Sequence, residues 1–76
     1  MRLSFALAHP DRVALMIFDV GGRVVRRVID ESMSAGPHAR AWDGTDDRGR
    51  AVPSGRYFAR LTAGTRTETL GVLRLR

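Results

Sequence analysis

Short runs in which apolar and polar residues alternate recur along the chain, and turn-forming residues separate them. In residues 2–7, for example, Leu3, Phe5 and Leu7 fall on one side, and this period of two is typical of a half-buried β-strand. No segment has the three- and four-residue spacing of an amphipathic helix. These patterns predict an all-β sandwich of about six to seven short antiparallel strands.

The expected strands cover residues 2–7, 13–18, 24–29, 38–42, 56–62 and 66–76. The second run is apolar on both faces, which predicts a central strand. Alternation is imperfect in the third run, which indicates a bulge or an edge position. Residues 30–37 are expected to form a loop. In the last run the apolar side chains change face after Val72, which predicts a bulge near Gly71 and Val72.

The small size and the composition exclude several classes of protein. A chain of 76 residues is expected to form one domain, and the absence of cysteine excludes a disulfide framework and a thiolate metal site. No apolar run approaches the roughly 20 residues of a membrane span. The net charge of +5 comes from 13 basic residues that are all Arg. Because Lys, Asn and Gln are all missing, we attribute this to the composition of a GC-rich genome.

Three motifs follow one another in the sequence. Residues 13–25 read V-x-L-x-I-F-D-x-x-G-R-x-V, residues 35–38 read A-G-x-H, and residues 42–57 read W-D-G-x-D-x-x-G-x-x-V-x-S-G-x-Y. Together they resemble the Ig-like domain of the flagellar hook-capping protein and the C-terminal sorting domains of the type IX secretion system. The positions that carry the motifs and their turns are Asp19, Gly22, Arg23, Gly36, Trp42, Asp43, Gly44, Asp46, Gly49, Gly55 and Tyr57.

The resemblance implies an immunoglobulin-like β-sandwich and a role outside catalysis. It covers nearly the whole chain, but the Asn-Pro-Phe segment that often opens such domains is missing, and Pro10 is displaced. We therefore expect residues 1–76 to be a single Ig-like domain, a C-terminal module of a larger protein. The implied function is sorting, anchoring or assembly of a bacterial exported or cell-surface protein through a protein partner. The implied location is extracellular or at the cell surface, with the periplasm as an alternative.

Two other functions stay open. One is a flagellar hook-cap assembly domain, and the other is a basic module that binds polyanions or nucleic acid. The terminal residues 73–76 resemble the basic last strand of sorting domains. We expect Arg56, Arg60, Arg74 and Arg76 to face the partner. Nucleic acid is disfavoured, because only Phe58 supplies an aromatic ring between such charges.

The polar residues of the 42–57 segment could be read as a binding site. Asp43, Asp46 and Asp47 invite a calcium interpretation, but their spacing does not match an EF-hand loop, and Asx turns explain them better. Trp42 and Tyr57 could be an exposed stacking pair, but a single Trp in a small sandwich is more often a core anchor. We expect Trp42 to be buried and Tyr57 to point inward with its hydroxyl near a loop.

The sequence offers no arrangement of catalytic residues. His9 and His38 stand apart from any nucleophile motif, and we interpret them as solvated surface residues rather than as acid–base groups. The glycines of the 42–57 segment lack the Lys-Ser/Thr pair and the helix of a phosphate-binding loop. We therefore expect a protein that is not an enzyme and needs no cofactor or metal.

Overall fold

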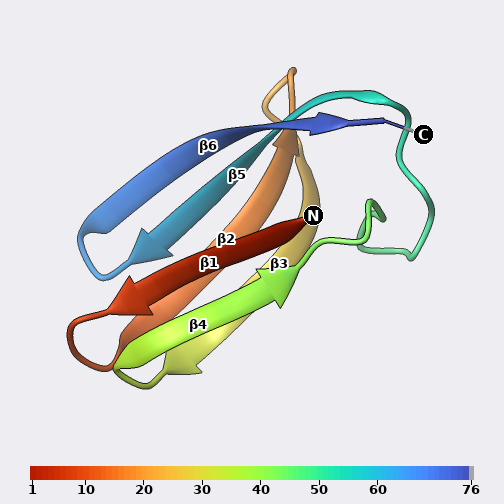
Figure 1. The fold of residues 1–76 in the computed structure, drawn as a ribbon. Helices are drawn as coiled ribbons and strands as arrows, with labels where there is room; N and C mark the ends of the chain where they lie inside the picture. The colour runs from red at the N-terminus through yellow and green to blue at the C-terminus, as the bar shows by residue number, and fades with distance from the viewer. Residues whose placement is uncertain (76) are drawn as a thin grey trace.

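The computed structural model describes residues 1–75, and every regular element in this part of the chain is a strand. The strands are β1 (Arg2–Leu7), β2 (Asp11–Asp19), β3 (Val24–Met33), β4 (Gly36–Ala41), β5 (Gly55–Ala63) and β6 (Arg66–Arg74). They form two antiparallel sheets, one of order β1-β4 and one of order β3-β2-β5-β6 (Figure 1). The predicted all-β, Ig-like sandwich is confirmed. Nothing in residues 1–75 forms a helix that could cross a membrane.

The core lies between the two sheets and follows the alternation of the strands. In β2, Val13, Leu15 and Ile17 all point inward and are buried. Burying an aliphatic side chain of this size contributes about 1.5–3 kcal/mol to folding. The other strands add their inward residues to the same cluster, and Trp42 and Val52 join it from the long connection between β4 and β5.

Strand β2 is central, as predicted, because it pairs with β3 on one side and with β5 on the other. Strand β3 is at the edge of the sheet and contains two irregularities. Its pairing with β2 skips Val28 and then Val25, and both side chains pack against the core. The imperfect alternation of residues 24–29 therefore reflects both an edge position and bulges.

Two sequence predictions about the strands are wrong. Of the loop expected over residues 30–37, residues 30–33 continue β3 and residues 36–37 begin β4, because an edge strand needs no apolar contacts along its solvent side. The expected bulge near Gly71 is absent, since β5 and β6 pair without a break from Gly55–Arg74 to Ala63–Arg66. The apolar residues of β6 change face because this edge strand buries only Val72 and leaves Leu70 52% exposed.

Candidate interaction surface

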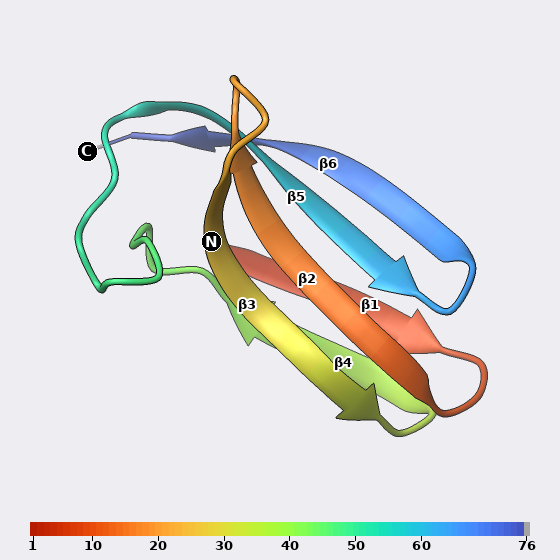
Figure 2. The ribbon, with the colours of Figure 1, turned by 180° about the vertical axis from the view of Figure 1, so that it is seen from behind.

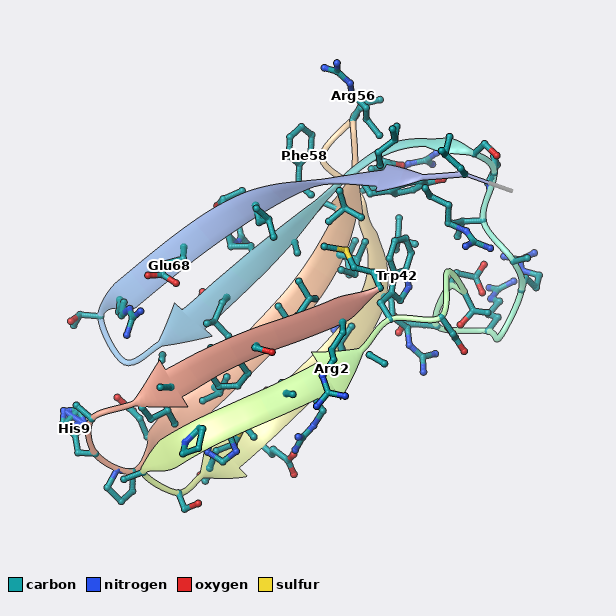
Figure 3. The ribbon with its side chains drawn as sticks, in the orientation of Figure 1. Arg2, His9, Trp42, Arg56, Phe58 and Glu68 are labelled. Atoms are coloured by element: carbon teal, nitrogen blue, oxygen red, sulfur yellow. The ribbon has the colours of Figure 1, made fainter. Side chains whose placement is uncertain are left out.

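Trp42 and Tyr57 anchor the long connection between β4 and β5 to the core. Trp42 follows β4 (Figure 3) and is only 3% exposed. Its ring meets the Tyr57 ring edge-on with 5.5 Å between centroids. The indole Nε1 donates a hydrogen bond of 2.9 Å to the carbonyl oxygen of Thr45. The predicted burial of Trp42 is confirmed, and burial leaves this pair unsuited to stacking on a ligand.

Tyr57 fixes the other end of this connection. Its side chain is buried, and its hydroxyl donates a hydrogen bond of 2.7 Å to the carbonyl oxygen of Pro53. A tyrosine hydroxyl that bonds to the backbone a few residues upstream is the tyrosine corner of immunoglobulin-like sandwiches. The predicted inward orientation of Tyr57, with the hydroxyl near a loop, is confirmed.

Three motif carboxylates shape turns. Asp46 Oδ1 accepts hydrogen bonds from the backbone amides of Arg48 and Arg50, at 2.9 and 3.0 Å. Asp19 Oδ1 accepts from Gly21 and Arg23 in the same way, at 2.9 and 3.0 Å, in the turn between β2 and β3. Asp43 Oδ1 accepts from the backbone amide and the hydroxyl of Thr45. These bonds stabilise the local backbone, as Asx turns do.

The same hydrogen bonds favour the charged form of each carboxylate. The pKa of Asp46 is lowered mainly by the backbone amide of Arg50, and the pKa of Asp19 mainly by that of Arg23. The pKa of Asp43 is lowered mainly by the hydroxyl of Thr45. Each group is therefore a stronger acid in the folded state than in the unfolded chain.

The carboxylates of the long connection do not converge on one point. Asp47, next to Asp46, turns to β3 and accepts from the backbone amide of Arg27 at 2.9 Å and from its guanidinium at 3.3 Å. Residues 1–75 contain no group of three or more His, Asp or Glu side chains that could hold a metal ion. The calcium interpretation therefore gains no support from the geometry.

The two histidines lie at one end of the sandwich. His9 is exposed in the turn after β1 (Figure 3), and the Nε2 atom of His38 on β4 lies 2.7 Å from the carbonyl oxygen of Ser34. The His38 ring also packs near Phe5, with 5.5 Å between centroids. Within the part of the chain that the structure describes, neither imidazole has an ion pair with a carboxylate.

Many of the arginines have acidic partners. The ion pairs are Arg12–Asp30, Arg23–Asp19, Arg27–Asp47, Arg40–Glu31, Arg50–Asp46 and Arg66–Glu68. These pairs are largely exposed and add little to stability. They do cancel the local charge over much of the surface, so the excess positive charge lies on other arginines.

Arg56 and Arg60 are among the arginines without an acidic partner. Both lie on β5 and point away from β1 and β4, on what we call the outer face of the four-stranded sheet. Neither has an ion pair among the described residues, and the Arg60 guanidinium lies 4.4 Å from the centroid of the Phe18 ring. Phe58 lies between them along β5 and on the same strand face, and Figure 3 labels Phe58 and Arg56. The structure thus brings together two of the four arginines expected to face a partner.

Of the other two arginines, Arg74 does not belong to this group. Arg74 is half-buried, and its guanidinium packs so close to Gly44 that a Cβ atom there would lie 2.0 Å from Cζ. Its Nε atom is buried, so Arg74 is part of the packing rather than a free partner-facing charge. Arg76 lies outside the described residues.

The apolar residues that complete the outer face were not predicted from the sequence. Val24, Phe18, Phe58 and Gly71 are paired in register across the four strands, and we call this set the outer row. Leu73 lies next to the row, paired with Arg56. The apolar side chains at the even positions of β2 indicated that its outer face is apolar. Only the pairing register of the strands, however, places Phe18 beside Phe58.

The sequence matches the family model of the FlgD Ig-like domain over residues 1–67. The chain belongs to the FlgD Ig-like domain family. It is 42% identical over 53 residues to the basal-body rod modification protein FlgD of Salmonella typhimurium, and the match covers 70% of this chain and 23% of that protein. The FlgD protein of Escherichia coli K12 is 38% identical over the same length and coverage. The chain therefore spans about a quarter of the length of these curated relatives.

Membership of the FlgD Ig-like family corrects two expectations. The extracellular or cell-surface location, with its periplasmic alternative, is wrong, because the matched relatives are flagellar basal-body rod modification proteins rather than surface-sorted proteins. The sorting function gains no support from these relatives. The flagellar alternative fits them better.

Proposed function

We propose that this FlgD Ig-like domain is a non-catalytic protein-binding domain that acts in hook-cap assembly of the bacterial flagellum. The observation that carries the proposal is the match to the FlgD Ig-like family over residues 1–67, together with relatives named for modification of the basal-body rod. Its partners are accordingly proteins of the growing flagellar structure. The proposal includes that residues 1–76 act as one domain of a longer protein, and the length of the relatives supports this.

The chemistry of the motif residues supports a structural rather than a catalytic role. Asp19, Asp43 and Asp46 already accept backbone hydrogen bonds, and a carboxylate engaged in this way is held in its charged form. Trp42 and Tyr57 are occupied in the core. We propose that the motif positions, including Gly22, Gly36, Gly49 and Gly55, maintain the fold, while the exposed sheet surface binds the partner.

The direct test is an in-frame deletion of the segment that encodes these 76 residues, in the organism that carries this sequence. The proposal predicts that cells lose hooks and filaments in electron micrographs, while their other exported proteins reach their usual places. Expression of the intact gene from a plasmid is the control and restores the hooks. Normal flagella after the deletion, or loss of a surface protein instead, would overturn the proposal.

A further inference from the structure

The outer face of the four-stranded sheet is more apolar than a solvent-facing sheet surface usually is. One face of an antiparallel sheet packs on the core, and the other is normally polar. Here Phe58 is 40%, Val24 38% and Leu73 65% exposed, and they gather around the outer row. Contiguous exposed apolar residues of this kind mark a site of interaction.

Nothing in residues 1–75 covers this face. Figure 2 shows β3, β2, β5 and β6 toward the viewer, with β1 and β4 behind them. Gly71 pairs with Phe58, and a Cβ atom at Gly71 would meet no other atom within 4 Å. The missing side chain leaves a shallow hollow of about 200 Å³ beside the Phe58 ring, which Arg56 and Leu73 also line. An apolar side chain of a partner could fill it.

The unpaired charges around the outer row have one sign. Arg56 and Arg60 flank Phe58 along β5 and have no ion pair among residues 1–75. Asp30 on the same face is already paired with Arg12 at 2.8 Å, and Asp47 near Val24 is paired with Arg27 at 3.3 Å. An aromatic ring between two arginines has the composition of an interface hot spot. Complementarity therefore requires carboxylates on the partner.

We propose that the outer face, centred on Phe58, Arg56 and Arg60, docks an acidic protein segment that inserts an apolar side chain beside Gly71. This inference names the partner surface for the assembly function proposed above and rests on that function. A second copy of the domain does not fit, because its net charge of +5 would repel. Nucleic acid fits less well, because it calls for several phosphate contacts and a stacking platform, whereas Arg60 already lies over the Phe18 ring and aliphatic Val24 and Leu73 border the Phe58 ring.

The test is to select 12-residue peptides from a random displayed library on the 76-residue chain. The affinity of every selected peptide is then measured for the parent and for the triple variant Arg56→Gln, Phe58→Ser, Arg60→Gln. The matched control is Arg2→Gln, Arg48→Gln, which also removes two exposed arginines, one on β1 and one in the long connection. Thermal melts of both variants verify that they fold. Because the changed side chains are exposed, both should melt like the parent.

We expect the selected peptides to combine Asp or Glu with Leu or Phe. They should bind the triple variant at least about tenfold more weakly, the effect of losing a hot-spot residue, and bind the control as they bind the parent. Amide signals of Val24, Phe58 and Leu73 should shift when such a peptide is added. Neutral or basic peptides, equal binding to the triple variant, or no selected peptides would overturn the proposal.

Tighter binding of a 20-nucleotide single-stranded DNA through the same residues would assign the face to polyanions instead. The deletion phenotype above is independent of these results, so failure of the surface and failure of the flagellar function are distinguishable.

Discussion

At the scale of single residues, a contact between Gly44 and Arg74 packs the β4–β5 connection against the last strand, β6. Gly44 has a φ of 79°, a conformation that costs other residues about 1–2 kcal/mol. Its open side is filled by the Arg74 guanidinium. Gly49 has nearly the same φ, 78°, but no atom within 4 Å of a built Cβ. The two glycines therefore separate backbone strain from packing.

We predict that Gly44→Ala destabilises the domain more than Gly49→Ala. Both substitutions should cost about 1–2 kcal/mol through backbone strain, and Gly44→Ala also displaces the Arg74 guanidinium. The extra cost should disappear in the Arg74→Ala background, in a double-mutant cycle with a coupling of about 0.5 kcal/mol or more. Urea unfolding followed by Trp42 fluorescence measures it. Equal costs at Gly44 and Gly49 would contradict this packing role of Arg74.

The Tyr57 hydroxyl permits an equally local prediction. Tyr57→Phe removes the donor to the Pro53 carbonyl and should lower the free energy of unfolding by about 1–2 kcal/mol. The control is Phe58→Tyr on the neighbouring exposed ring, which should stay within about 0.5 kcal/mol of the parent. If Tyr57→Phe unfolds at the same urea concentration as the parent, the corner does not stabilise the domain.

At the scale of elements, the turns after β2 and β4 depend on ionised carboxylates. The pKa values of Asp19, Asp43 and Asp46 are lowered below the ordinary 3.8. The stability that these groups contribute is therefore fully present above about pH 5 and is lost as the pH falls through 3.8 toward their folded-state values. Acid should loosen these two connections before it affects the paired strands.

We predict that the melting temperature falls between about pH 5 and pH 3, and that Asp19→Asn, Asp46→Asn flattens this fall. Asparagine keeps an oxygen acceptor for the turn but has no charge to lose. The control is Asp30→Asn, because the Asp30 carboxylate bonds only to the Arg12 side chain among the described residues. In this variant the melting temperature should fall with pH as steeply as in the parent. A double variant as steep as the parent would show that these carboxylates do not govern acid stability.

The elements also show how far sequence reasoning reaches. Period-two alternation located the buried faces of β1, β2 and β5, because each strand has one side on the core. It missed the last residues of β3, since polar residues at a sheet edge look like a loop. It misplaced a bulge in β6 because this edge strand buries few side chains, so apolar residues such as Leu70 and Leu73 can lie on either of its faces.

At the scale of the whole molecule, β1 and β4 pack on one face of the four-stranded sheet, and nothing in residues 1–75 covers its other, outer face (Figures 1 and 2). The grouping of Arg56, Phe58 and Arg60 could be predicted, because alternate residues of one strand share a face. The contributions of Phe18, Val24 and Gly71 could not, since they depend on the register of three strand pairs. The burial of Arg74 depends on a tertiary contact with Gly44 that no local pattern records.

The role of the outer face is measured most directly by complementing the deletion strain with surface variants and counting hooks per cell in electron micrographs. We predict that the parent gene restores hooks, and that the double variant Arg2→Gln, Arg48→Gln does so as well. The triple variant Arg56→Gln, Phe58→Ser, Arg60→Gln, at equal protein level, should not restore them. Hooks in normal number with the triple variant would contradict the claim that this FlgD Ig-like domain assembles flagella through its outer face.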